Sequence, residues 1–134
     1  PEAIVFVAAE WPTKIIFTGG GEFSRRYSTG EYLLENASQE NPCRLAYTLF
    51  FERSGWAKGP NHHSADLIAL LVAARVVDPY FDLVSQGYNH IFPNGTHEWR
   101  SSPNKNQCYI TQDMDPKKVI HEMSVLMAYE PETR

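Results

Sequence analysis

The sequence predicts an α/β fold, for three reasons. The apolar run over residues 14–18 is typical of a short strand, and apolar residues recur at helical spacing over 43–53 and 119–127. Asn94-Gly95, between two β-type segments, predicts a hairpin because it supplies both positive-φ positions of a tight turn. A strand before helices at the front, with a hairpin region behind, fits α/β or α+β.

Composition limits the kinds of protein that this can be. The 134 residues are enough for one domain or part of one, and 43% hydrophobic and 13% aromatic content suit a packed core. The formal charge of −4 argues against general nucleic-acid binding. No apolar run approaches the roughly 20 residues that span a bilayer. On these two grounds, neither a nucleic acid nor a membrane is an expected partner.

The first segment predicts a helix over residues 1–10. Pro1 and Glu2 suit the first helical turn, and Trp11-Pro12 ends the helix. No capping residue precedes Pro1, so we expect the chain to be cut from something longer. The glycines at 19–21 follow the strand at 14–18, and without a phosphate-loop pattern they predict a turn.

Two helices and a loop are expected next. Residues 29–36 suggest a short helix or turn, and Asn41-Pro42 precedes a clearer helix over 43–53. Residues 56–63 are rich in Gly, Pro and Asn and predict a loop.

The segment from Ser64 predicts a helix that is buried on most sides, because residues 67–77 leave almost no polar face. Ser64 suits the N-cap, and Asp66 falls in the first turn, where the helix dipole favours a carboxylate. His62 and His63 precede it. Asp66 therefore either stabilises the start of the helix or is part of a functional site.

The last third predicts strands and one helix. Residues 80–84, 88–92, 97–100 and 107–110 suit strands, and Asp115-Pro116 starts a helix with an apolar stripe. Asn94-Gly95-Thr96 also fits a glycosylation sequon. Cys43 and Cys108 allow one disulfide at most and lack zinc-site spacing, so two unpaired thiols in or near the core are expected.

These segments, in this order, resemble the inosine/uridine-preferring nucleoside hydrolase family. The resemblance implies the C-terminal portion of the family domain, an open and mostly parallel sheet with helices on both faces. No single motif is very specific, and order and spacing carry the likeness. The matching stretches are Pro1-Glu2-Ala3, residues 11–19, residues 64–71, residues 78–83, Asn94-Gly95-Thr96 and the helix at 117–127.

The resemblance implies hydrolysis of the N-glycosidic bond between ribose and base. Calcium would hold the ribose hydroxyls and a water, and a carboxylate would take the proton of that water. Asp66 matches the late aspartate that completes the family's calcium site. The Asp-rich loop that supplies most ligands has no counterpart here, since Asp113-Met114-Asp115 has the pattern of a helix cap.

Other positions depart from the family pattern. Many members place histidine directly before the aspartate, where this chain has Ala65. His62 and His63 are candidate substitutes, although we expect exposed loop histidines. Trp56 and Tyr88 are candidates for a base-stacking pocket, although aromatic core residues are commoner. We assign no chemistry to His90, His97 and His121.

Two functional hypotheses follow, from different classes. The chain is either the C-terminal portion of a calcium-dependent N-ribosyl hydrolase, inactive alone because one carboxylate cannot supply calcium's 6–8 oxygen ligands, or a non-catalytic binding or assembly module derived from that fold. The first implies a nucleoside substrate and a missing N-terminal half or covering chain. Homo-oligomerisation stays open, as does a third interpretation, an unrelated α+β protein in which Asp66 only supports its helix.

Overall fold

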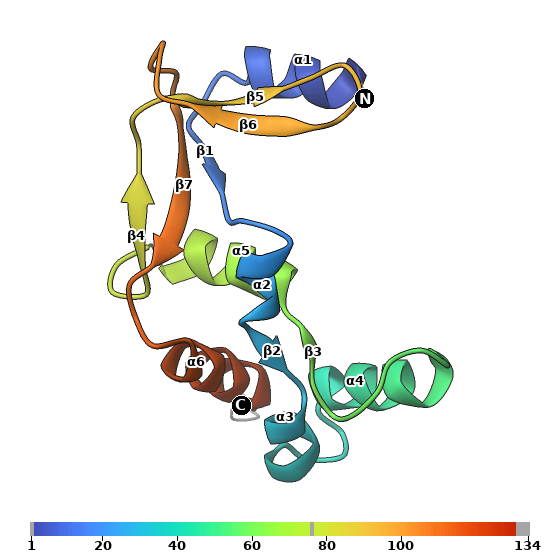
Figure 1. The fold of residues 1–134 in the computed structure, drawn as a ribbon. Coiled ribbons are helices and arrows are strands. Elements are labelled where there is room, and N and C mark those ends of the chain that lie inside the picture. The colour runs from blue at the N-terminus through green and yellow to red at the C-terminus, as the bar shows by residue number, and fades with distance from the viewer. Residues whose placement is uncertain (1, 76, 131–134) are drawn as a thin grey trace. The chain divides into compact units, whose positions relative to one another are not determined.

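The computed structural model describes residues 2–75 and 77–130, which fall into two compact units (Figure 1). The first unit contains residues 1–19 and 77–113, and the second contains 20–76 and 114–134. Helices and strands occur together with a small mixed sheet, so the α/β prediction is confirmed at the coarse level. Among the described residues, no helix is both long and apolar enough to cross a membrane.

The first unit is built on a three-stranded sheet in the order β1-β7-β4. The strand β1 (Ile15–Phe17) runs parallel to β7 (Gln107–Gln112), and β4 (Phe81–Val84) runs antiparallel to β7. Side chains from β4 and β7 form its core, where Phe81, Cys108 and Ile110 are buried. The predicted strands are confirmed, although β1 is more open than expected, since Ile16 is 37% exposed.

A separate hairpin follows the sheet strand β4. The strands β5 (Tyr88–Ile91) and β6 (His97–Arg100) pair antiparallel, as the Asn94-Gly95 turn predicts. Gly87 lies just before β5 with φ +116°, and a Cβ there would meet the Arg100 carbonyl oxygen. Only glycine allows the two strands this approach.

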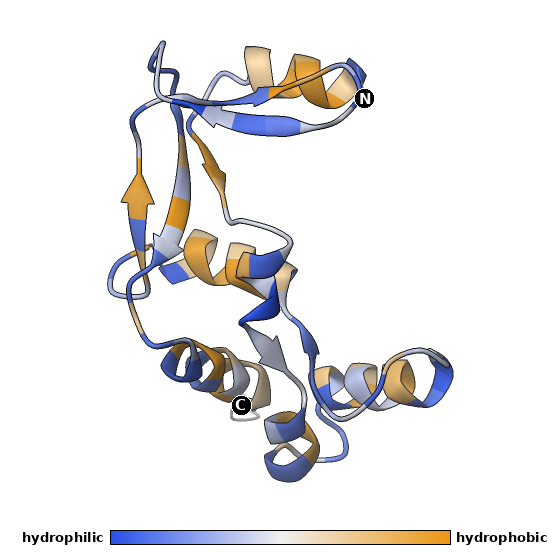
Figure 2. Ribbon diagram, viewed as in Figure 1, coloured by the Kyte–Doolittle hydropathy of each residue, from blue (hydrophilic) through white to orange (hydrophobic). Residues whose placement is uncertain are grey.

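The helix α1 (Glu2–Glu10) buries none of its residues. Its ribbon is largely apolar in Figure 2, and Ile4, Phe6 and Val7 are 56%, 68% and 45% exposed. One bond ties it to the sheet, from Gln107 Nε2 to the Ala8 carbonyl oxygen at 2.7 Å. The predicted helix is confirmed, and Pro1 lies outside the described residues.

The second unit is mainly helical. Its elements are α2 (Glu22–Arg25), β2 (Ser28–Thr29), α3 (Glu31–Asn36), α4 (Pro42–Arg53), β3 (His62–His63), α5 (Ala65–Arg75) and α6 (Pro116–Ala128). The short elements α2, β2 and β3 were not expected from the sequence. Five apolar side chains dominate the core, and these are Tyr27, Leu33, Ile68, Val119 and Met123.

The two long helices α4 and α6 begin where the sequence places their caps. Asn41 Oδ1 accepts from the Arg44 N–H at 3.0 Å, and Asp115 Oδ1 accepts from the Lys117 N–H at 3.0 Å. Each cap is followed by proline at the first helical position, where the missing N–H costs nothing. Asp115 is therefore a cap, as predicted.

The expectation that α5 is buried on most sides is wrong. Ile68, Leu71 and Val72 face the core, whereas Leu70 is 63% exposed and the alanines at 69, 73 and 74 are also exposed. A nearly continuous apolar sequence does not say which faces neighbouring elements cover. Val76, in the predicted helix, lies outside the described residues.

Candidate functional site at the start of α5

A two-residue antiparallel ladder, formed by β2 and β3, precedes α5 and positions its start. β2 and β3 pair antiparallel, with Thr29 opposite His62 and Ser28 opposite His63. The Ser64 N–H then donates to the Tyr27 carbonyl oxygen at 2.9 Å. These bonds fix the two histidines and Asp66 relative to β2.

Ser64 links β2 and β3 through its buried hydroxyl. Its Oγ accepts from the Thr29 N–H at 3.1 Å, donates to the His62 carbonyl oxygen at 3.1 Å, and lies 2.7 Å from Thr29 Oγ1. A hydroxyl has one proton and two lone pairs, so these three bonds use its full capacity. Ser64 precedes α5 as predicted. Its hydroxyl bonds Thr29 on β2 and His62 on β3, however, and is not free to cap the helix.

The hydroxyl bonds continue to α4. Thr29 Oγ1 lies 2.5 Å from the Tyr47 hydroxyl oxygen. Because Ser64 spends its proton on His62, the consistent direction of donation runs from Tyr47 to Thr29 to Ser64. This ordered chain joins α4, β2 and the start of α5.

His62 is part of an aromatic cluster. Its ring centroid lies 4.8 Å from that of Phe50 and 5.4 Å from that of Trp56. A small pocket of about 210 Å³ lies beside it, lined by Ala46, Tyr47, Phe50 and His62. Trp56 is 66% exposed and is therefore not a core residue.

The expectation that both histidines are exposed loop residues is wrong in part. Both belong to β3, and His62 is half-buried against the aromatic rings, whereas His63 is exposed. The Nδ1 atom of His63 lies 3.4 Å from Ser28 Oγ. No strand could be predicted here from the sequence, because a two-residue ladder is too short to show alternation.

Asp66 lies in the first turn of α5 and is exposed. Within the described part of the chain, no side chain or backbone group bonds its carboxylate. The helix dipole favours a negative charge at this position. The backbone of Asp66 is thus positioned by the start of α5, and its exposed carboxylate is available to accept ligands.

No complete metal site surrounds Asp66. In residues 2–75 and 77–130 there is no group of three or more His, Cys, Asp or Glu side chains arranged to hold a metal ion. Calcium needs 6–8 oxygen ligands. Any calcium bound by Asp66 would need most of its ligands from elsewhere.

The remaining candidate residues belong to other elements. Tyr88, His90 and His97 belong to the β5–β6 hairpin of the first unit, where the Lys105 Nζ atom stands 4.5 Å from the Tyr88 ring centroid. His121, on α6, packs edge-on against Tyr32 with centroids 5.6 Å apart. Tyr88 therefore has a charged surface partner, and His121 has a packing role.

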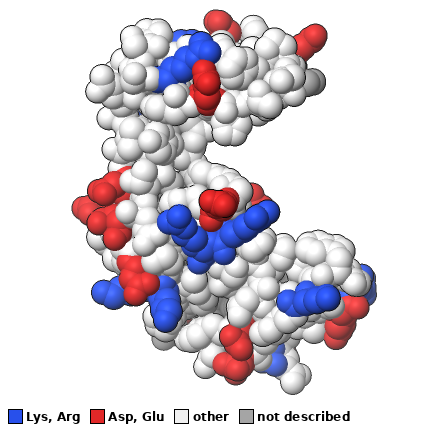
Figure 3. Space-filling view, in the orientation of Figure 1, with Lys and Arg blue, Asp and Glu red and all other residues white. Residues whose placement is uncertain are grey.

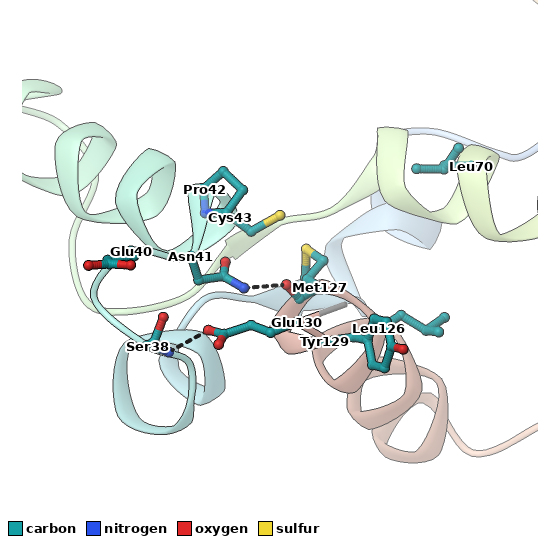
Figure 4. A pocket seen from close by; sticks show the side chains of 10 residues that line it. All are labelled: Ser38, Glu40, Asn41, Pro42, Cys43, Leu70, Leu126, Met127, Tyr129 and Glu130. Carbon is teal, nitrogen blue, oxygen red and sulfur yellow. Dashed lines mark hydrogen bonds between the residues drawn. The ribbon is translucent and has the colours of Figure 1, made fainter. Parts of the chain in front are cut away.

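A pocket of the second unit, at the start of α4 and the end of α6, was not expected from the sequence. It has a volume of about 560 Å³ and its lining is Ser38, Glu40, Asn41, Pro42, Cys43, Leu70, Leu126, Met127, Tyr129 and Glu130 (Figure 4). The Asn41 side-chain amide donates to the Met127 carbonyl oxygen at 3.1 Å, and the Ser38 N–H donates to Glu130 Oε1 at 3.3 Å. A neighbouring hollow of about 270 Å³ shares Leu70, Leu126 and Met127.

The distribution of charged side chains does not mark the start of α5 or the pocket of about 560 Å³ as a binding site. Lys and Arg side chains are interspersed with Asp and Glu on the face that Figure 3 draws. A salt bridge joins Arg100 and Glu98, two residues apart on β6. Comparisons of this chain with protein-family models, with curated proteins and with solved structures give no match.

Proposed function

We propose that this chain is the C-terminal portion of a calcium-dependent N-ribosyl hydrolase that cleaves the N-glycosidic bond of nucleosides. Asp66 is one calcium ligand in the complete domain. By itself the chain is inactive, because the other ligands come from carboxylates outside it. The resemblance of segment order to nucleoside hydrolases motivates this proposal.

The observation that carries the proposal is the exposed carboxylate of Asp66 at the start of α5. The carboxylate is exposed, has no bond among the described residues, and sits in the first turn of a helix whose start is anchored by the Ser64 hydroxyl. Asp115, an N-cap residue, spends its carboxylate on the Lys117 N–H, whereas Asp66 lies inside the first turn and keeps its carboxylate exposed. An exposed carboxylate on a positioned helix start is suited to a metal.

The aromatic cluster supports a role in holding the base. The rings of Phe50 and Trp56 pack against His62, which belongs to β3 and precedes Asp66 by four residues. Aromatic rings bind a flat heterocycle by stacking. In this proposal His62 takes the place of the histidine that many family members have at the position of Ala65, and it would protonate the leaving base.

The exposed apolar surfaces support completion by another segment. Several apolar side chains are more than half exposed, among them Ile4 and Phe6 on α1 and Leu70 on α5. A segment that covered them would remove apolar surface from water, which is favourable. The proposed cover is the N-terminal half of the same domain.

The experiment is to produce the protein encoded by the complete reading frame and to measure release of base from inosine and uridine with and without calcium. We expect calcium-dependent release, and none from residues 1–134 alone. Full activity of the isolated 134-residue chain, or a complete protein that releases no base from any nucleoside, would overturn the proposal.

A second candidate is a non-catalytic binding or assembly module. It is favoured by the absence of a three-ligand metal group among the described residues and by the pocket of about 560 Å³, whose lining is largely apolar. A module would fold and bind its partner equally well in calcium and in a chelator, whereas the hydrolase would lose activity in the chelator.

A further inference from the structure

The sequence contains two Asn-x-Ser/Thr triplets, Asn36-Ala37-Ser38 and Asn94-Gly95-Thr96. Such triplets are acceptors for N-linked glycans when the residue between is not proline. The enzyme that transfers the glycan must reach the asparagine Nδ2 atom. The two triplets differ sharply in whether that atom is available.

Asn94 lies at the tip of the β5–β6 hairpin, where residues 93–98 are all exposed. The loop is closed by two backbone bonds, from the Phe92 N–H to the Thr96 carbonyl oxygen at 2.8 Å and from the Gly95 N–H to the Phe92 carbonyl oxygen at 2.9 Å. The acceptor triplet is therefore presented on an exposed and well-defined turn.

The Asn94 amide is oriented by Thr96. Asn94 Oδ1 accepts from the Thr96 N–H at 3.0 Å and from the Thr96 hydroxyl at 2.7 Å. The Oδ1 end of the amide is thereby engaged, and no bond to Nδ2 is found in the described ranges 2–75 and 77–130. The nitrogen that would receive a sugar is free.

Asn36 is arranged in the opposite way. It is the last residue of α3, and its Nδ2 donates to the Tyr32 carbonyl oxygen at 2.9 Å. Ala37 beside it is only 5% exposed, and the Ser38 N–H bonds Glu130. Asn36 is exposed, but glycosylation there would require Nδ2 to give up its bond to Tyr32, at the end of a helix and next to a buried alanine.

We propose that Asn94 is an N-glycosylation site of this protein and that Asn36 is not. The donor is a lipid-linked oligosaccharide diphosphate. A bond forms between Asn94 Nδ2 and the anomeric carbon of the first sugar, the bond from that carbon to phosphate breaks, the lipid diphosphate leaves, and Nδ2 loses one proton. No oxidant or reductant is needed.

The test is to express the whole chain behind a cleavable secretory leader in cultured animal cells, and to recover it from total membranes and medium alike. Intact mass and glycopeptide mapping, before and after treatment with an N-glycosidase, locate each glycan. We expect one glycan, on Asn94, and aspartate at position 94 after the enzyme. The same chain without the leader should carry none.

Four variants make the assignment specific. We expect Asn94→Gln and Thr96→Ala to lose the glycan completely, and Thr96→Ser and Asn36→Gln to keep it. Recovery from membranes ensures that a variant retained for poor folding is still scored. A glycan on Asn36, a glycan surviving in Asn94→Gln, or unmodified chain from the secretory route would overturn the proposal.

Discussion

At the scale of single residues, the most ordered feature is the chain of hydroxyls that joins Tyr47, Thr29 and Ser64. Thr29 and Ser64 are 1% and 3% exposed, so each bond between them is shielded from water. Shielded polar groups are strongly destabilising when they lose a partner. The position of Asp66, two residues beyond Ser64, depends on this chain.

We predict that Ser64→Ala destabilises the protein by about 1–3 kcal/mol, because the Thr29 N–H and the His62 carbonyl group each lose a partner. Urea denaturation followed by circular dichroism measures the free energy of unfolding. Ser101→Ala is the matched control, since Ser101 is exposed, and it should stay within about 0.5 kcal/mol. Equal effects of the two substitutions would contradict the hydroxyl chain.

The two cysteines also differ at this scale. The structure leaves both as free thiols, as predicted, with Cys108 fully buried and Cys43 half-exposed at the rim of the large pocket. Burial raises the pKa of the Cys108 thiol, and nearby Lys14 offsets only part of that effect. The folded state therefore favours the protonated thiol, and its contribution to stability is lost as the pH rises above the ordinary thiol pKa.

We predict that iodoacetamide at pH 8 labels Cys43 in the native protein and labels Cys108 only after unfolding, since the thiolate is the reacting form and Cys108 is inaccessible. Peptide mapping by mass spectrometry gives the two rates. In Cys43→Ser, native labelling should almost vanish. Native Cys108 reacting as fast as Cys43 would show that the β1–β7 sheet opens readily.

At the scale of elements, the side-chain caps of α4 and α6 could be predicted from the sequence, whereas the bonds that the Ser64 hydroxyl makes to the strands could not. Asn41 and Asp115 each bond a backbone N–H two or three residues on, which is a local interaction that sequence spacing reveals. Ser64 bonds Thr29, which is 35 residues away. A partner so distant in the sequence cannot be recognised from residue spacing, yet it determines which groups the Ser64 hydroxyl bonds.

We predict that Asn41→Ala costs about 2 kcal/mol and Asp115→Ala about 1 kcal/mol. Both remove a helix cap worth about 1 kcal/mol, but Asn41 is buried and its amide also donates to the Met127 carbonyl oxygen. Thermal and urea unfolding measure the difference. Asn41→Asp keeps the cap and loses the donor, so it should also be destabilising; equal stability of Asn41→Asp and the parent would contradict the second bond.

At the scale of the whole chain, sequence reasoning located most helices and strands but misjudged how they are covered. Residues 67–77 were expected to be buried because they are apolar, yet Leu70 is exposed, and the apolar helix α1 buries nothing. Periodicity indicates secondary structure, whereas coverage depends on which other elements pack against it. For the same reason the sequence singled out Asp66 and Trp56 but gave no sign of the large pocket.

The exposed apolar helix should make the isolated chain self-associate. We predict that Phe6→Glu lowers the apparent mass in sedimentation velocity and leaves the free energy of unfolding nearly unchanged, because Phe6 is 68% exposed. Gln39→Glu adds the same charge at an exposed polar position and should leave the association unchanged. Identical sedimentation of the parent and both variants would contradict an association driven by α1.

The central claim is that Asp66 binds calcium in a nucleoside-cleaving domain, and one measurement tests it most directly. In the complete protein, kcat/KM for inosine is compared between parent, Asp66→Asn and Asp113→Asn across a calcium titration. We predict a fall of roughly 100-fold or more for Asp66→Asn, relieved little by added calcium, with parent-like circular dichroism and parent-like turnover in Asp113→Asn. Parent-like turnover and calcium dependence in Asp66→Asn would contradict the claim.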